Sequence, residues 1–409
     1  MRLLTILFAA GSLFAQSHWV GTWGAAPSPQ LDPEPMQAQF KAVFDNQTIR
    51  EIVHTTIGGE SVRVRLSNTF GSVPARIGAA HIAVRATGSA IKPGTDHVLT
   101  FSGRPAIEIP AGGIVLSDPV KLPVPAAADL AISLYLSGKL LGAGVHYSAQ
   151  QTSYIAGGDA TASPSLDKAT PFTSWAFLTG VDVLAPANAS SVITFGDSIT
   201  DGARSTNDTN HRWPDTLAAR LLARKGQPPL AVVNMGIGGN RILHEGAASK
   251  RQQFGINALA RFDQDVLAQP GVKYLVIMEG INDIGHAGSS APASEAVSAE
   301  DIEAGLRQMI ERAHERGIKV FGATLTPFEG PANKTRGYWT PEKAKIREAV
   351  NEWIRTSKAF DAVIDFDKVV RDPASPNQIL AAYDSGDQLH PGDKGYEAMG
   401  NAVDLSIFR

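Results

Sequence analysis

One serine, one histidine and one aspartate in this 409-residue sequence have the types and spacing that nucleophilic catalysis needs. Ser198 follows an apolar run and precedes a helical pattern, so we expect its hydroxyl at a helix N-terminus. A serine hydroxyl becomes a nucleophile only when a base removes its proton, and His390 can be that base because imidazoles exchange protons near neutral pH. Asp387 precedes His390 by three residues, a spacing that lets a carboxylate fix the tautomer of the ring. We therefore predict a nucleophile, its base and an orienting carboxylate.

Attack on a carbonyl group also needs hydrogen-bond donors aimed at the oxyanion that forms. The backbone N–H groups of Ser198 and Gly239 and the side-chain amide of Asn282 are the predicted donors. Gly239 suits this role because a missing Cβ lets a substrate approach the backbone closely. We predict substrate contacts for Asp197 and Trp213, although Trp213 could equally pack under the sheet.

Each of these residues also has an ordinary structural role when it is taken alone. A serine after a strand is often only a helix N-cap, and Gly239 and Asn282 could be turn-formers. His390 could be a surface histidine of the last helix. The complete set, in order and at the ends of separate apolar runs, favours catalysis.

Parallel strands are expected to position this set. Amphipathic helical patterns, such as the apolar face from Ile302 to Ala313, lie between β-rich apolar runs in the second half of the chain. Such an alternation predicts a parallel sheet that is covered on both faces, and ligands bind at the carboxyl ends of its strands. The predicted strands are 192–195, 230–234, 274–278, 320–325 and 362–366.

The first half has a period of two instead. Short runs such as 61–67 alternate apolar and polar residues, and Gly and Pro separate them. Many short strands with frequent turn signals predict a β-sandwich or jelly roll. We therefore predict an all-β domain at 17–186 and an α/β domain at 187–409. The linker at 184–190 is too short for wide separation, so the β domain is expected to form one wall of the active site.

The first 16 residues resemble a secretory signal peptide, with Arg2 before an apolar run at 3–10 and small residues near 13–16. A buried first strand or a short membrane anchor is the alternative, but the run is too short to span a bilayer. We expect a secreted or periplasmic protein.

Composition excludes several classes of function. The chain has no cysteine, which excludes a thiol nucleophile, a disulfide redox centre and a Cys-based zinc site. It has 37 Lys and Arg against 40 Asp and Glu, a net charge of −3 without a basic run, so nucleic-acid binding is not indicated.

Four sequence blocks together resemble the SGNH (GDSL-type) hydrolase superfamily. They are FGDS at 195–198, NMGIGG at 234–239, GIND at 280–283 and DQLH at 387–390. The resemblance implies a flavodoxin-like fold with a five-stranded parallel sheet, no metal or organic cofactor, and ester hydrolysis through an acyl-enzyme. It gives Ser198, Asp387 and His390 the catalytic roles and places Ser198, Gly239 and Asn282 in the oxyanion hole.

The resemblance has two small departures. The nucleophile block reads Gly-Asp-Ser-Ile instead of Gly-Asp-Ser-Leu, and Gly238 stands where some relatives carry Ser, which puts the stiffness of that loop in doubt. The segments at 52–58 and 211–214 look like a two-domain bacterial branch grouped with xylan-esterase-like enzymes. That likeness implies acetylated plant polysaccharide as the substrate, and the sequence has no long hydrophobic lid segment, which favours short acyl groups over long-chain lipids.

Three other functions stay open. A metallohydrolase could use carboxylates and histidines, although the acids have roles without a metal. A non-enzymatic carbohydrate-binding protein with a relic hydrolase domain is the second alternative, and a short-chain lipase or arylesterase is the third. The expected partner is a small ester or an acylated carbohydrate. The candidate metal ligands are Asp197, His211, Asp283, Asp387 and His390.

Overall fold

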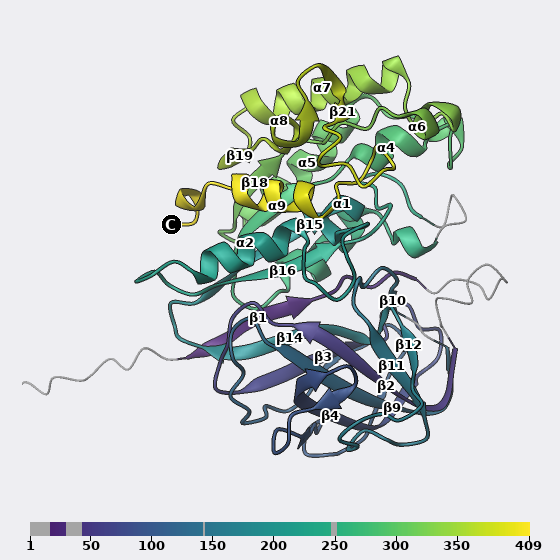
Figure 1. Cartoon of the computed structure of the whole chain (residues 1–409), viewed down its shortest axis with the longest axis vertical. Coiled ribbons are helices and arrows are strands. Elements are labelled where there is room, and N and C mark those ends of the chain that lie inside the picture. Colours follow the sequence, from purple (N-terminus) through teal and green to yellow (C-terminus); the bar gives the residue numbers. More distant parts are fainter. Residues whose placement is uncertain (1–16, 30–42, 142–143, 247–251) are drawn as a thin grey trace, which may run out of the picture.

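The computed structural model describes residues 17–29, 43–141, 144–246 and 252–409, and it consists of two halves stacked on each other (Figure 1). The predicted signal peptide at 1–16 lies outside these residues. The first half ends with β14 (Leu178–Ala185), and the second begins with β15 (Ser190–Gly196). The first half is all-β and the second contains a parallel sheet with helices, so the predicted fold class is confirmed.

Antiparallel sheets form the first half. One sheet has the strand order β1-β14-β3-β8, and a larger one has the order β12-β11-β2-β9-β4-β5, with β6 and β7 also paired to β4. The strands are β1 (His18–Gly24), β2 (Val43–His54), β3 (Val62–Ser67), β4 (Ala75–Thr87), β5 (Ala90–Ile91), β6 (His97–Val98), β7 (Ile107–Ile109), β8 (Ile114–Leu116), β9 (Asp129–Leu141), β10 (Val145–His146), β11 (Ser153–Gly157), β12 (Thr170–Phe172) and β13 (Trp175–Ala176).

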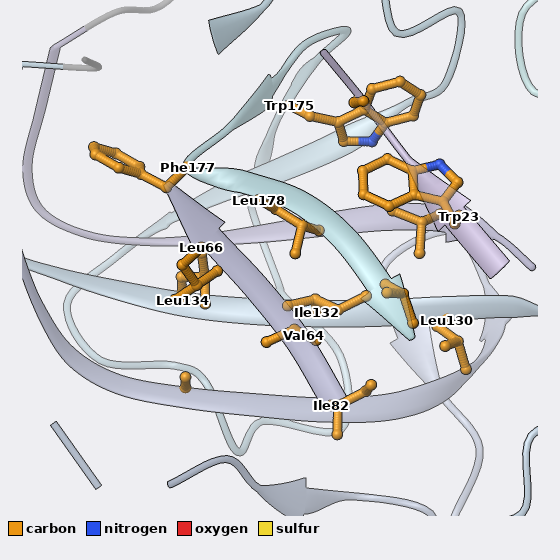
Figure 2. Packing of buried hydrophobic residues seen from close by; sticks show 14 of the residues in the cluster. Trp23, Val64, Leu66, Ile82, Leu130, Ile132, Leu134, Trp175, Phe177 and Leu178 are labelled. Atoms are coloured by element: carbon orange, nitrogen blue, oxygen red, sulfur yellow. The ribbon is translucent and has the colours of Figure 1, made fainter. Parts of the chain in front are cut away.

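The core of the β half lies between these two sheets. Val64 and Leu66 of β3 face Ile132 and Leu134 of β9 (Figure 2), and all four side chains are fully buried. Arg63, between two inward residues, lies on the opposite face of the strand, where its Nε pairs at 3.0 Å with the buried carboxylate of Asp182. Burying an aliphatic side chain contributes about 1.5–3 kcal/mol, so the period-two pattern of the sequence marks the inward face of each strand.

The second half is built on a sheet of five parallel strands in the order β16-β15-β17-β18-β19. This order is the flavodoxin-like one. Each predicted run corresponds to a strand, but the last two runs, 320–325 and 362–366, each extend two residues beyond their strands, which end at Ala323 and Ile364. The strands after β15 are β16 (Leu230–Gly236), β17 (Val272–Met278), β18 (Lys319–Ala323) and β19 (Ala362–Ile364).

Helices cover both faces of this sheet. Ile193 and Phe195 of β15 lie in one apolar cluster with residues of α5 and α7, whereas Val192 lies in the opposite cluster with residues of α2 and α9. Neighbouring residues of a strand point to opposite faces, so a strand buried on both sides must be apolar throughout. The longer helices are α2 (Trp213–Leu222), α5 (Ala299–His314), α7 (Pro341–Thr356) and α9 (Asp393–Ala402).

The remaining elements of the second half are short, and no helix in the described part of the chain has the length and apolar character to cross a membrane. They are α1 (Ser198–Asp201), η3 (Gln252–Phe254), α3 (Ala258–Phe262), η4 (Asp263–Leu267), α4 (Ile281–His286), η5 (Ala293–Glu295), α6 (Pro331–Thr335), α8 (Phe366–Val370), β20 (Arg371–Asp372), β21 (Ser375–Ile379) and η6 (Leu405–Ile407).

The two halves are in direct contact where β1 packs beside β16 (Figure 1). A Cβ on Gly24 would come within 2.4 Å of the Met235 side chain, so the strands approach closely. The Thr56 hydroxyl accepts a hydrogen bond of 3.1 Å from the backbone N–H of Val232. These contacts fix the β half against the edge strand of the parallel sheet.

Candidate active site

Ser198 is the first residue of α1, directly after the carboxyl end of β15. The carboxylate of Asp197 caps this helix by accepting a hydrogen bond of 2.9 Å from the backbone N–H of Ile199. An N-cap satisfies a backbone donor that the helix itself cannot pair. The cap therefore holds the strand-to-helix turn that presents the Ser198 hydroxyl at the edge of the sheet.

Ser198, His390 and Asp387 form a continuous hydrogen-bonded line. The Ser198 Oγ lies 2.8 Å from Nε2 of His390, and Nδ1 of the same ring lies 2.8 Å from Oδ2 of Asp387. A carboxylate accepts hydrogen bonds, so Nδ1 carries a proton and Nε2 is free to accept the proton of the serine. The structure thus brings the three residues together in the predicted arrangement.

Asp387 is held as a carboxylate. Burial by itself would raise its pKa, but hydrogen bonds from the side chain and backbone N–H of His390 and from the backbone N–H of Leu389 outweigh burial and keep the pKa well below its usual range. Nε of Arg204 also donates to this carboxylate at 3.2 Å. Asp387 therefore remains charged at any pH at which the site works and can stabilise an imidazolium beside it.

Asn282 lies at the start of α4, which follows β17, and it is only 4% exposed. Its Oδ1 accepts a hydrogen bond of 2.8 Å from the hydroxyl of Tyr338. That bond fixes the amide so that Nδ2 is the free end, and Nδ2 has no hydrogen-bond partner among the described residues. An unpaired buried donor beside a nucleophile can receive the charge of a tetrahedral intermediate.

Gly239 lies in the loop after β16 and has a φ of +78°, in the left-handed region that favours glycine. The ring of Phe254 packs directly on it, at 2.2 Å from the place where a Cβ would stand. No other residue type would fit here without displacing the ring. Gly239 and Asn282 line the same cavity as Ser198, as the predicted oxyanion hole requires.

This cavity has a volume of about 310 Å³, and both halves of the molecule line it. The α/β half contributes the reacting groups together with Phe254, Tyr338 and Arg336. The prediction that the β half forms a wall is confirmed, because four of its residues line the same space. They are Ser28, His146, Tyr147 and Ser148.

The predicted substrate contacts of Asp197 and Trp213 were wrong. Trp213 is fully buried, and its ring lies 5.1 Å from that of Phe366 beneath the sheet. The apolar face of α2 turns inward at this residue, so the indole serves the core. Asp197 is also fully buried under the nucleophile, where burial raises its pKa to about 7. Both side chains lie outside the lining of the cavity.

The acids and histidines considered as metal ligands have other partners. Asp283 accepts hydrogen bonds from the backbone N–H groups of Ile242 and Leu243, at 2.8 and 3.0 Å. His211 lies on the surface, where Nδ1 is 2.9 Å from Oδ2 of Asp393. Within residues 17–29, 43–141, 144–246 and 252–409, no group of three such side chains is placed to hold a metal ion.

Several residues of the site carry no clear signal in the sequence. Tyr338 reaches Asn282 across 56 positions of the chain, and no local pattern indicates such a contact. His146 is the last residue of the two-residue strand β10, and Ser148 follows two positions later, so no local pattern marks either of them. Only the packing of the two halves places them beside the nucleophile.

A family model for the GDSL-like lipase/acylhydrolase family matches residues 194–398. Solved structures of a GDSL-like lipase from Bacteroides thetaiotaomicron VPI-5482 and of an aryl esterase from M. smegmatis are similar, at 19% and 16% identity. Their TM-scores are 0.37 and 0.41, and the matches cover 54% and 52% of this chain and 88% and 95% of theirs.

Est24, a carbohydrate acetylesterase from Sinorhizobium meliloti, is similar at 18% identity and a TM-score of 0.39, over 52% of this chain and 95% of Est24. No curated protein matches the chain.

Proposed function

The chain belongs to the GDSL-like lipase/acylhydrolase family, within the SGNH hydrolase superfamily, and we propose that it is a serine esterase. The proposed reaction removes short acyl groups, acetyl above all, from acylated carbohydrate. The observation that carries the proposal is the 2.8 Å contact between the Ser198 Oγ and His390 Nε2, with Asp387 directly behind the ring.

The proposed chemistry has two halves. Ser198 Oγ attacks the acyl carbon while its proton passes to Nε2 of His390, and the oxyanion is bound by the N–H groups of Ser198 and Gly239 and by Nδ2 of Asn282. His390 then gives its proton to the departing alcohol, which leaves an acyl-enzyme. A water molecule loses a proton to His390 and attacks the acyl-enzyme, and release of the acid restores Ser198.

The preference for a short acyl group is supported by the packing around the oxyanion donors. Phe254 lies against Gly239, and its ring is stacked on that of His286 at 5.1 Å. This stack limits the room beside Gly239 to a small substituent. The described residues include no long apolar segment over the cavity that could receive a fatty acyl chain.

A carbohydrate as the alcohol is supported by the polar side chains of the opposite wall. Ser28 and Ser148 of the β half and Gln253 of the α/β half line the cavity. Such groups exchange hydrogen bonds with hydroxyls at fixed positions. The aromatic side chains of the cavity also suit an aryl alcohol, which keeps an arylesterase as the second candidate.

The test compares wild type with Ser198→Ala on p-nitrophenyl acetate, butyrate and octanoate, and on acetylated xylan and rhamnogalacturonan. We expect kcat/KM to be highest for the acetate and to fall at least about 10⁴-fold in Ser198→Ala, because the nucleophile has no substitute. Ser137→Ala is the matched control, since it removes the hydroxyl of a half-buried serine outside the cavity and should keep the kcat/KM of wild type.

Equal rates for wild type and Ser198→Ala would end the proposal and favour the relic binding protein. Faster cleavage of the octanoate than of the acetate would contradict the short acyl group. Hydrolysis of p-nitrophenyl acetate without acetate release from either polysaccharide would favour the arylesterase.

We further propose a domain boundary at residue 186/187, supported by the change of sheet between β14 and β15. Export to the periplasm or the medium is proposed on the apolar run at 3–10 alone.

A further inference from the structure

His146 of the β half lies at the boundary with the α/β half and is only 5% exposed. Its Nδ1 is 3.0 Å from the backbone oxygen of Ala26, and its Nε2 is 2.9 Å from Oδ1 of Asp201. A carbonyl oxygen and a carboxylate can only accept hydrogen bonds, so both ring nitrogens must donate. A neutral imidazole has a single N–H, and therefore only the imidazolium satisfies both partners.

Asp201 connects this ring to the loop of the oxyanion hole. It ends helix α1, three residues after the nucleophile, and is 3% exposed. Its second oxygen, Oδ2, accepts a hydrogen bond of 3.2 Å from the backbone N–H of Gly238. Gly238 supplies the carbonyl of the peptide bond that carries the Gly239 N–H, so the position of Gly238 sets the direction of that donor.

Gly238 is the residue of this loop that the carboxylate of Asp201 holds. Glycine at 238 has no side chain to pack, and a Cβ there would lie 3.8 Å from Asp201 and 3.9 Å from Ser198. A glycine backbone has more conformational freedom than that of other residues. The hydrogen bond from the Gly238 N–H to the carboxylate of Asp201 restrains it. A catalytic donor that is misplaced by about 1 Å can cost about 100-fold in rate.

The other charged groups around His146 come from several elements. Arg212, before α2, donates to the backbone oxygen of Asp201 at 2.7 Å and to that of Ala149 in the β half. Asp265 of η4 is the next carboxylate that interacts with the ring, and His54 and Asp215 line a small cavity beside it. Asp201 is the acid in hydrogen-bond contact with the ring. The positive charge of Arg212 opposes protonation of the His146 ring.

We propose that His146, as an imidazolium, is a positioning residue of the esterase: through Asp201 and Gly238 it holds the Gly239 N–H in its catalytic orientation and makes catalysis dependent on its own protonation. The proposal rests on the proposed function of the same site. It gives the β half a part in the chemistry beyond that of a wall, because one histidine of that half determines how well the oxyanion is bound.

The electrostatics of the pair agree with this role. Burial alone would lower the pKa of His146, but the charge of Asp201 and the hydrogen bonds to Asp201 and Ala26 outweigh burial and raise the pKa. The imidazolium is therefore the form that the fold stabilises. Its contribution is fully present below the ordinary pKa of a histidine and is lost as the pH rises through the raised pKa.

The test is the pH dependence of kcat for p-nitrophenyl acetate between pH 6 and 10, with buffer hydrolysis subtracted, in wild type, His146→Ala, His146→Gln and Asp201→Asn. We expect kcat of wild type to decline at alkaline pH. At pH 6, His146→Ala should lower kcat by about 10- to 100-fold while KM stays within about twofold, because the oxyanion forms only in the transition state.

His146→Gln keeps a donor toward Asp201 and cannot titrate. It should restore kcat to within about threefold of wild type and abolish the alkaline decline, a rescue that a purely structural role would not produce. Asp201→Asn should lower kcat as His146→Ala does, because a neutral amide cannot accept two charge-assisted bonds. The matched control for His146→Ala is His81→Ala, which breaks a pair with Asp96 at 2.9 Å elsewhere in the β half.

A wild-type kcat without an alkaline decline overturns the proposal and needs no variant. It is also overturned if His146→Gln retains the decline, or if His146→Ala has the kcat of the His81→Ala control. If His146→Ala does not fold, the pH dependence of kcat in wild type and in His146→Gln tests the proposal. A wild-type enzyme that is no more active than Ser198→Ala contradicts the proposed function, whereas an active wild type with unchanged His146 variants contradicts this inference alone.

Discussion

The strands of the two halves run in different ways, antiparallel in the β half and parallel in the α/β half, and this difference decides which half brings the candidate catalytic residues together. In the β half, antiparallel strands end at both edges of each sheet, so polar loop residues are distributed over two ends. In the α/β half, all strands point the same way, and the loops after β15, β16 and β17 meet at one edge. Ser198, Gly239 and Asn282 come from those three loops.

The β half reaches the site through a short segment instead. His146, Tyr147 and Ser148 project from the region of β10, and Ser28 lies beside them through the bridge from its backbone to Val145. A parallel sheet thus gathers polar loop residues at one edge, whereas the antiparallel sandwich supplies a surface that covers this edge. Variants of the two halves should therefore affect different kinetic parameters.

The largest effect within this comparison is expected for the oxyanion donor of the α/β half. Asn282→Ala should lower kcat by about 10²–10³-fold with little change in KM, because the amide binds charge that exists only in the transition state. Steady-state kinetics on p-nitrophenyl acetate measure this. Tyr338→Phe, which removes the hydroxyl that orients the amide, should show a smaller decrease in kcat of about 3- to 10-fold.

A change confined to KM in Asn282→Ala would mean that the amide binds the ground state, and the assignment of the oxyanion hole would then be wrong.

The second prediction compares the buried carboxyl groups of the two halves. Asp197 under the nucleophile and Glu51 in β2 are both fully buried, and burial raises the pKa of each, for Asp197 to about 7. A raised pKa means that the folded state keeps a proton that the unfolded chain has lost. Wild-type stability should therefore fall as the pH rises from about 4 to 7.

Asp197→Asn removes this penalty and keeps an N-cap oxygen. We expect its free energy of unfolding to exceed that of wild type by about 2–4 kcal/mol at pH 8 and to equal it at pH 4, as measured by urea denaturation. Glu51→Gln should show the same sign and leave kcat within about twofold, because Glu51 lies away from the cavity. A stability gain that is the same at pH 4 and pH 8 would contradict the role of ionisation.

The smallest effect is expected for the wall of the β half. Ser148→Leu should raise KM for p-nitrophenyl butyrate by about 3- to 10-fold and leave kcat within about twofold, because the larger side chain narrows the cavity without touching the reacting groups. Ser137→Leu, at a half-buried serine of β9 outside the cavity, is the control. A fall in kcat without a change in KM would show that Ser148 acts on the chemistry instead.

The candidate catalytic residues could be predicted because each carries a local signal in the sequence. Asp387 and His390 are three residues apart, and Ser198 follows a strand whose apolar run is easily recognised. The error at Trp213 has the opposite cause. An indole near Ser198 in sequence can face either the substrate or the core. Trp213 lies on the buried face of α2 and therefore packs in the core.

The sequence by itself determined the alternating burial of the β half, the parallel sheet with its helices, and the candidate catalytic residues, because each depends on short-range periodicity or on a strand end. Only the tertiary structure decided how the β half meets the site. The contacts of His146 with Asp201 and of Tyr338 with Asn282 join residues 55 and 56 positions apart. Such contacts depend on how whole sheets and helices pack, and a local pattern contains no record of that packing.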